Sequence, residues 1–184
     1  YYILLNKPAG YTSTKFDPFA KKTVLELVAD VSANLHTVGR LDVDTEGLII
    51  LTNDGDLTYR LTHPSHEIGK TYVATVRGKV DEDDLDRLRT GIQLEDGVTA
   101  PAKAKLLNVS PDGRRSTVEL TIHEGKKRQV RRMFNAIGHR VEHLIRTKIG
   151  SISIGNLKAG EWRYLTDDEV KRLKESAQPK AKKE

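Results

Sequence analysis

The chain has 184 residues, contains no cysteine and carries a formal net charge of +5. This length suffices to bury most of the apolar surface in one domain. The absence of cysteine excludes disulfides, thiolate catalysis and cysteine-ligated zinc. No apolar run approaches the length of a membrane span and no signal-peptide pattern starts the chain, so we expect a cytoplasmic protein with no membrane partner. The only methionine is Met133, so we expect the chain to be a fragment.

The first half of the chain alternates predicted strands with short helices. Apolar and β-branched runs bounded by turn residues predict strands at residues 1–5, 48–51 and 69–78. Capping residues followed by apolar spacing predict helices that begin at Thr23, Asp56 and Asp81. In the last of these helices we expect Leu85 and Leu88 to face inward and Gly91 to end the helix.

The second half of the chain opens with a predicted hairpin. Pro111-Asp112-Gly113 separates two β-rich runs, residues 102–110 and 115–125. A helix is predicted within residues 128–138, where one apolar stripe is formed by Val130, Met133, Phe134 and Ile137. Gly138 ends this helix.

Two further strands and a last helix complete the predicted fold. The strands lie at residues 151–155 and 162–165, and Thr166-x-x-Glu169 forms a capping box for the helix. We expect residues 1–175 to form one domain and residues 176–184 to form a basic, disordered tail. Hairpins with interspersed helices predict an α+β fold with a mixed, mostly antiparallel sheet flanked by helices.

Three carboxylates, those of Asp42, Asp44 and Glu46, reproduce the start of a calcium-binding loop, D-x-D-x-E-G. Counted from Asp42, position nine of that loop is Ile50 and position twelve is Asn53, where a bidentate glutamate is required. The closing ligand is therefore missing. Because a strand-length apolar run follows the carboxylates, we expect no metal at this loop and Asp44 and Glu46 to face solvent.

The segment HRVEH, from His139 to His143, matches a zinc-protease pattern in which two histidines share one helical face. Here Gly138 has just ended a predicted helix, and the segment after it is predicted to be extended. At ~3.3 Å per residue, the two rings then stand roughly 13 Å apart, too far for one zinc ion. No phosphate-binding loop or dinucleotide fingerprint is found either, so no cofactor is expected.

Positive charge is concentrated in residues 124–148. Against two glutamates, this segment carries Lys126, Lys127, Arg128, Arg131, Arg132, Arg140, Arg146 and Lys148. Its net charge is +6, and the rest of the chain sums to −1. Such a segment is expected of a protein with a phosphate-rich partner, while the alternative is a solvated helix face.

Four segments, in this order, resemble a known family: YYILLNKPAGYTST, GRLDVDTEGLIILTNDGDL, KTYVATVRG and EGKKRQVRRMF. The resemblance is to the catalytic domain of bacterial ribosomal RNA pseudouridine synthases of the RsuA/RluB family, and the RluB-type synthases are the most similar. It spans residue 1 to about residue 165. Members of the family usually begin with a small S4-like RNA-binding domain, which is absent from this sequence.

The resemblance implies a fold with a central RNA-binding cleft and an activity, the isomerisation of a uridine in ribosomal RNA to pseudouridine. It implies a 23S target in a stem-loop of the large-subunit RNA and no cofactor, and we expect a monomer. The family's motifs place its catalytic aspartate at Asp42, its active-site tyrosine at Tyr72 and its basic partner at Arg131. Arg40 resembles the arginine that occupies the space left by the extruded base.

The remaining RNA contacts are predicted from charge. We expect phosphate contacts from Lys126, Lys127, Arg128 and Arg132. The rival interpretation is a non-catalytic, ribosome-associated RNA-binding module, which explains the basic segment equally well. It does not explain Asp42, because a carboxylate that faces RNA weakens binding unless it takes part in chemistry.

Overall fold

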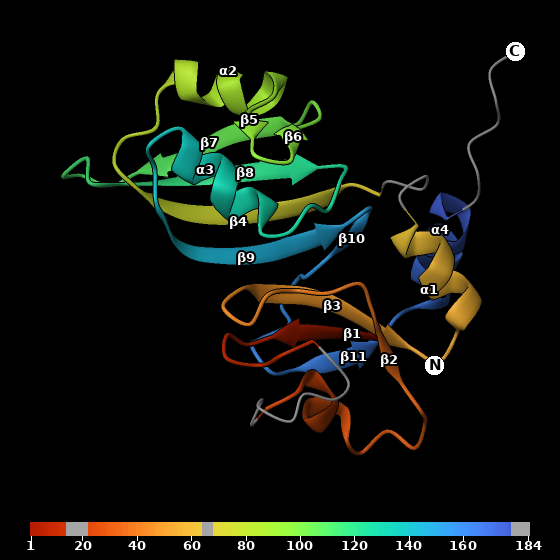
Figure 1. Cartoon of the computed structure of the whole chain (residues 1–184). Helices are drawn as coiled ribbons and strands as arrows, with labels where there is room; N and C mark the ends of the chain where they lie inside the picture. The colour runs from red at the N-terminus through yellow and green to blue at the C-terminus, as the bar shows by residue number, and fades with distance from the viewer. Residues whose placement is uncertain (14–21, 64–67, 178–184) are drawn as a thin grey trace, which may run out of the picture. The chain divides into compact units, whose positions relative to one another are not determined.

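The computed structural model describes residues 1–13, 22–63 and 68–177. The contacts group the chain into two compact units, one formed by residues 1–68 and 148–184 and the other by residues 69–147. They are called unit 1 and unit 2 below, and each is described by itself (Figure 1). The predicted tail falls, from residue 178 onward, outside the described residues.

Unit 1 contains a small antiparallel sheet with β1 between β11 and β3, and with β2 on the other edge of β3. The strands are β1 (Tyr2–Lys7), β2 (His36–Val38), β3 (Glu46–Thr52) and β11 (Trp162–Tyr164). A further short strand, β10 (Ile152–Ser153), pairs with residues 148 and 149. The helices are the 3-10 helix η1 (Val24–Val28), α1 (Gly55–Thr62) and α4 (Asp167–Ser176).

The core of unit 1 forms where one face of this sheet packs against α1 and α4. Leu4 of β1 lies directly opposite Ile50 of β3, and both are fully buried. They belong to one apolar cluster with Leu57 and Leu61 of α1 and Leu173 of α4. Burying each such side chain stabilises the unit by about 1.5–3 kcal/mol. Apolar packing therefore contributes more to the stability of this sheet than the few hydrogen bonds between its short strands.

The predicted cap of α1 is wrong by two residues. The cap is Asp54, whose carboxylate accepts a hydrogen bond from the Leu57 amide at 3.0 Å. Its other oxygen accepts one from the Tyr2 hydroxyl at 2.7 Å, which ties the helix start to β1. Asp56 lies inside the helix and pairs with Arg60 at 3.3 Å. The long-range contact with Tyr2 favours Asp54, and such a contact is invisible in the local sequence.

The capping box of α4 is confirmed, and its glutamate has a second partner. Glu169 accepts hydrogen bonds from Thr166 and, at 2.7 and 2.9 Å, from the Arg163 guanidinium of β11. The hydrogen bonds from Arg163 are the main cause that lowers the pKa of Glu169 from 4.5 to about 2, against the effect of burial. This ion pair therefore links α4 to the sheet.

We expect this pair to stabilise unit 1 above pH 4.5 and to lose its effect as the pH falls from 4.5 to about 2, because the folded pKa is the lower one. Arg163→Met should reduce the free energy of unfolding at pH 7 by on the order of 1–2 kcal/mol, a value discounted because Arg163 is partly exposed. Denaturant unfolding between pH 7 and pH 3 measures this. Arg60→Met, which removes an exposed pair, is the control, and equal losses in both variants would contradict the assignment.

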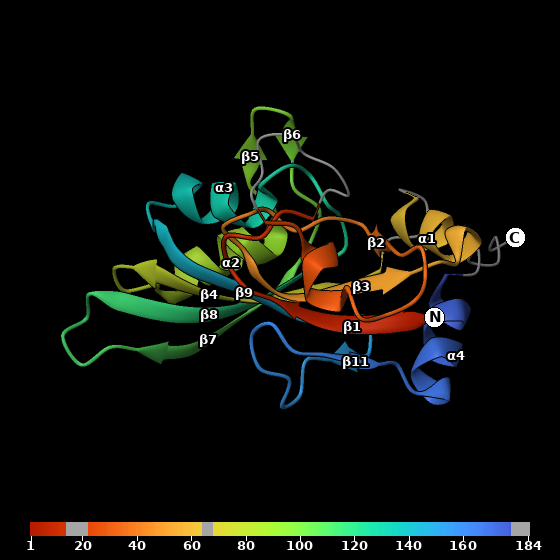
Figure 2. The ribbon, with the colours of Figure 1, turned by 90° about the horizontal axis from the view of Figure 1, so that it is seen from below.

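Unit 2 is built on a four-stranded sheet in the order β9-β4-β8-β7. The strands are β4 (Lys70–Arg77), β7 (Lys103–Val109), β8 (Arg115–Ile122) and β9 (Val141–Ile149). A two-stranded hairpin, β5 (Gln93–Leu94) and β6 (Gly97–Val98), lies beside α3 (Figure 2). The helices are α2 (Glu82–Thr90) and α3 (Gln129–Ala136).

One face of this sheet carries the core of unit 2. Ala74 and Val76 of β4 alternate with side chains on the other face, and they pack in one cluster with Leu85 of α2 and Phe134 of α3. The predicted stripe of α3 is confirmed, since all four of its members are buried. The capping box of Asp81, the end of α2 at Gly91 and the β7–β8 hairpin are confirmed as well. These elements were predictable because their signals lie within a few residues.

The α+β fold class, with largely antiparallel strands, is confirmed by both units. Among residues 1–13, 22–63 and 68–177, no helix is long and apolar enough to span a membrane.

Candidate functional site

Asp42 lies in the loop of residues 39–45, called the Asp42 loop below, which leads into β3. Its side chain is half-buried, whereas the next two residues, Val43 and Asp44, are exposed. A tight turn closes behind it, since the Thr45 amide donates to the Asp42 carbonyl at 3.0 Å. Ser13 clamps the loop from the other side: its hydroxyl donates to the Leu41 carbonyl at 2.9 Å and accepts from the Leu41 amide at 3.0 Å.

Lys7, the last residue of β1, anchors the Asp42 loop by a hydrogen bond to the backbone of Val43. Its side chain is fully buried, and its ammonium donates to the carbonyls of Pro8, Tyr11 and Val43 at 2.9, 2.9 and 3.2 Å. Burial lowers the pKa of Lys7 from 10.5 to about 8, while nearby carboxylates, Asp44 first among them, oppose the shift. Lys7 was not among the residues predicted from the sequence, although a lysine at the end of a buried strand was a signal.

The two carboxylates that follow Asp42 in the sequence lie in different environments, one in solvent and one at the start of the sheet. Asp44 is exposed as expected, but Glu46 is half-buried because it is the first residue of β3 and not part of the turn. The calcium-loop pattern is broken at this point: Ile50, its ninth position, is fully buried inside β3. Arg40 is exposed and follows Gly39, whose φ of 72° only glycine adopts easily.

Tyr72, the predicted active-site tyrosine, lies on β4 in unit 2. It is directly opposite Leu120 of β8 and shares a face with Ala74 and Val76. Part of its side chain packs against the core cluster and the rest is accessible, since the residue is only half-buried. Core packing therefore fixes the orientation of this ring, which is what a positioned stacking or proton-transfer group needs.

The predicted cations of unit 2 lie at the start of α3 and in the loop before it. Arg131 is half-buried on α3, and Arg132 forms a bidentate ion pair with Asp96 of the β5–β6 hairpin, at 2.8 and 3.1 Å. The hydrogen bonding to Asp96 raises the pKa of Arg132. Because Asp96 already neutralises it, Arg132 is a weaker candidate for phosphate contact than its exposed neighbours Lys127 and Arg128.

Gln129 shapes the loop of residues 124–128. Its buried amide donates to Glu124 at 2.6 Å and its oxygen accepts from the Lys126 amide at 3.1 Å. Glu124 also accepts from the Ala100 amide at 2.9 Å. Arg128, with φ of 50°, is the one non-glycine residue with positive φ among the described residues. The loop is thus held in a fixed, strained conformation. Gln129 was not predicted from the sequence, although a polar residue beside the apolar stripe of α3 was a signal.

Some of the predicted site residues belong to unit 1 and the others to unit 2. Asp42 and Arg40 belong to unit 1, whereas Tyr72, Arg131, Arg132 and residues 126–128 belong to unit 2. The predicted RNA-binding cations of unit 2 lie at the start of α3 and in the loop before it. The functional roles of all these residues remain predictions.

The histidine pair of HRVEH has a structural explanation in unit 2. His139 is buried, with Nδ1 2.7 Å from the Arg77 carbonyl oxygen and Nε2 2.9 Å from an Asp84 carboxylate oxygen. Both ring nitrogens of His139 are therefore engaged. His143 lies on the extended strand β9, as predicted for this segment.

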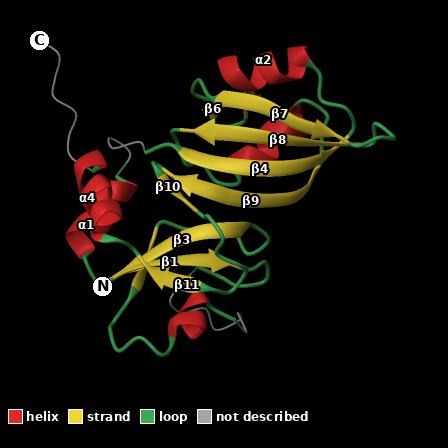
Figure 3. Cartoon of the chain, turned by 180° about the vertical axis from the view of Figure 1, so that it is seen from behind, coloured by secondary structure: helices red, strands yellow, loops and turns green. Residues whose placement is uncertain are grey.

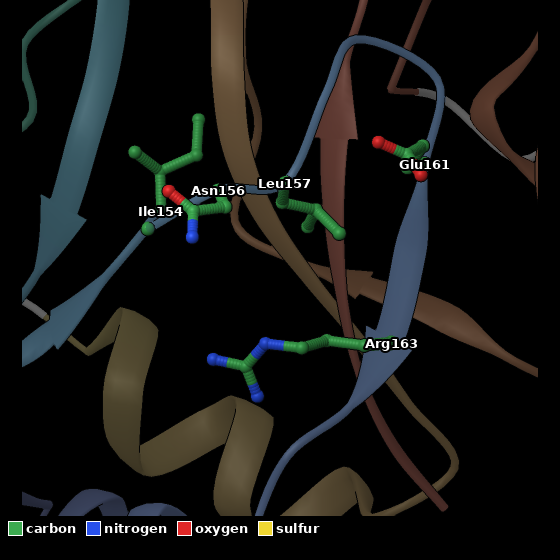
Figure 4. A pocket seen from close by; sticks show the side chains of 6 residues that line it. Ile154, Asn156, Leu157, Glu161 and Arg163 are labelled. Carbon is green, nitrogen blue, oxygen red and sulfur yellow. The ribbon is translucent and has the colours of Figure 1, made fainter.

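Unit 1 also contains a cavity of about 310 Å³ beside β11 (Figure 4). It is lined by Ile154, Gly155, Asn156, Leu157, Glu161 and Arg163. None of the predicted site residues lines it. Its charged groups are engaged within the protein, since Arg163 holds Glu169 and Glu161 accepts from the Lys158 amide at 2.8 Å. This cavity is therefore not the candidate active site.

Comparisons with known proteins agree on one family. The family model described as RNA pseudouridylate synthase matches residues 1–136. Ribosomal large subunit pseudouridine synthase B of Bacillus subtilis is 47% identical over 94% of this chain and 71% of its own length. Ribosomal small subunit pseudouridine synthase A of Vibrio vulnificus is 42% identical over 92% of this chain and 72% of its own length. A crystal structure of a pseudouridylate synthase, 38% identical, matches 94% of this chain and 73% of its own with a TM-score of 0.82.

Proposed function

Because the chain belongs to the RNA pseudouridylate synthase family, we propose that it isomerises a uridine of 23S ribosomal RNA and that Asp42 is its catalytic carboxylate. The observation that carries the proposal is the Asp42 loop. It holds a half-buried carboxylate on a backbone fixed by Lys7 and Ser13, beside two exposed residues. A carboxylate held in this way is preorganised for chemistry, whereas one that only binds solvent needs no such support.

The reaction makes definite demands on the protein. The bond between C1′ of the ribose and N1 of uracil breaks, the base turns, and a new bond joins C1′ to C5. The proton on C5 must then leave, and N1 gains a proton. Asp42 serves either as the nucleophile at C1′ or as the base that removes a proton, and both roles need an ionised carboxylate.

The other site residues are assigned by the motifs and supported by their local settings. We propose that Tyr72 stacks on the uracil and takes part in proton transfer at C5, for which its orientation is fixed by core packing. We propose Arg131 as the basic residue of the active site, as the family's motif assigns it, and Arg40 as the residue that fills the space of the flipped base. Arg40 is exposed, as that role requires.

A 23S substrate is proposed from the relatives. The relative named for the large subunit is 47% identical to this chain and the one named for the small subunit is 42% identical. Incubation of the protein with transcripts of 23S and 16S RNA, followed by mass spectrometry, tests the choice. Pseudouridine in the 23S transcript alone is expected. Binding without pseudouridine in either transcript would instead support the rival, a non-catalytic RNA-binding module.

The loop before α3 should provide affinity and not chemistry. Each phosphate contact contributes about 0.7–0.9 to the slope of log K against log salt. Joint replacement of Lys126, Lys127 and Arg128 by alanine should therefore flatten that slope by roughly 2–3 and weaken binding to target and non-target RNA alike. Turnover at saturating RNA should change little. Filter binding across a salt series, with single-turnover assays, measures both quantities.

The matched control for this triple variant removes three exposed lysines from unit 1, Lys158, Lys171 and Lys174. It makes the same change in net charge and should leave the slope near that of the wild type. If the loop variant bound RNA normally but lost single-turnover rate, the loop would belong to the active site and not to the docking surface.

A further inference from the structure

Five exposed cations meet at one end of the sheet of unit 2. They form what we call the tip patch: Arg77, Lys79, Arg114, Arg115 and Arg140. They come from three separate segments that backbone hydrogen bonds join, from the Arg77 amide to the Arg140 carbonyl at 2.9 Å and from the Gly78 amide to the Arg114 carbonyl at 2.6 Å. The turn between β7 and β8 extends past the other strands at this end (Figure 3). The patch therefore stands on a fixed backbone.

Two of these arginines face each other across neighbouring strands. Arg77 of β4 lies directly opposite Arg115 of β8, an arrangement of like charges that destabilises a sheet. Glu142 of β9 offsets the repulsion, since it accepts from the Nε atoms of both arginines at 2.7 Å. The two side chains nevertheless remain 61% and 56% exposed. One carboxylate thus orients two guanidiniums, and because it neutralises only one of the two positive charges, a net positive charge remains on this group.

The acidic residues near this end of the sheet do not cancel the patch. Asp112 accepts hydrogen bonds from Ser110 and the Arg114 amide, which close the turn, and it lies 4.0 Å from Nε of Arg114, so with Glu142 it offsets two of the five positive charges. Helix α2 packs on the other face of the sheet, because Val76 shares a core cluster with Leu85 of α2 and the Ser116 hydroxyl accepts from the Val80 amide just before α2. By strand alternation, Arg77 and Arg115 point away from it. On their own face the tip patch therefore has an excess of positive charge.

We propose that the tip patch is a second docking surface for RNA phosphates, separate from the loop before α3. This proposal rests on the proposed function, because it assumes that the substrate is RNA. Arginine is suited to this role, because its planar guanidinium binds phosphate oxygens in pairs. Arg115 and Ile122 are the two ends of β8, so the patch and the loop that follows β8 are about 23 Å apart at ~3.3 Å per residue. Only an RNA that spans this distance engages both surfaces.

The test compares two RNAs that share one target loop, a long stem-loop and a hairpin too short to span about 23 Å. The variant is Arg114→Gln with Arg115→Gln, and the control is Arg60→Gln with Arg87→Gln, which removes two exposed cations elsewhere. For the long RNA, the tip variant should flatten the salt slope by about 1.4–1.8. For the short RNA, it should bind and react like the wild type. Equal effects on both RNAs, or no effect beyond that of the control, would overturn the proposal.

A second variant reverses the sign of the change. Glu142→Gln removes the carboxylate that partly neutralises Arg77 and Arg115, so it should tighten binding to the long RNA and leave the short RNA unaffected. Weaker binding to the long RNA would contradict the proposal. Pseudouridine formed by the wild type on the short RNA is measured separately. If none forms while the length-dependent loss of affinity remains, the proposed reaction fails and the docking surface stands.

Discussion

Asp42→Asn should abolish pseudouridine formation while folding and RNA affinity stay near those of the wild type. Removing the ionised group eliminates both a nucleophile and a base, which contributes at least about 10²–10⁴ to the rate of such reactions. The substitution keeps the size of the side chain. Lys7 and Ser13 hold the backbone of the loop, so the loop should keep its conformation. Single-turnover assays by mass spectrometry, together with RNA-binding measurements, check each part.

The control for this variant lies two residues away in the same loop. Asp44→Asn makes the same chemical change at an exposed position and should leave turnover within about threefold of the wild type, since surface substitutions have small effects. If Asp42→Asn retained turnover within tenfold of the wild type, Asp42 would not be the catalytic carboxylate. Loss of activity in both variants would point to the charge of the loop as a whole.

The features that the sequence predicted correctly have local causes. The capping boxes at Asp81 and Thr166 and the apolar stripe of α3 are each encoded within about one or two helical turns. The hairpin between β7 and β8 is specified by its turn residues. Asp42 was chosen because a family motif surrounds it, and its catalytic role stays a prediction; the structure shows a half-buried residue in the loop before β3.

The features that the sequence did not predict depend on contacts between distant residues. β2, β5 and β6 have only two or three residues each, too few for a periodic signal, and pairing with a neighbour defines them. The tip patch combines three segments that only the strand register brings together. Lys7 was missed because its partners include Val43, 36 residues further along the chain.

The second large effect concerns Lys7, which we expect to position the Asp42 loop. Lys7→Met keeps the aliphatic stem and removes the ammonium with its three hydrogen bonds to backbone carbonyls. A displacement of about 1 Å in an active site lowers turnover by as much as roughly 10²-fold, so a loss of ten- to a hundredfold in rate is expected. RNA affinity should not change. Stability at pH 7 should change little, because the unsatisfied carbonyls and the relief of a buried charge act in opposite directions.

The pH dependence separates this positioning role from simple packing. The folded pKa of Lys7, about 8, lies below its ordinary value of 10.5, so between these values the unfolded chain binds a proton that the folded chain does not. The free energy of unfolding of the wild type, relative to that of Lys7→Met, should therefore rise from pH 8 to pH 10.5, by up to about 3 kcal/mol. Wild-type turnover should fall as the pH rises through about 8, the folded pKa, because the neutral amine has one donor fewer for three carbonyls. Lys22→Met, at an exposed lysine in unit 1, should show neither effect. Full turnover in Lys7→Met, or a stability difference that is flat above pH 8, would show that Lys7 does not hold the loop through its charge.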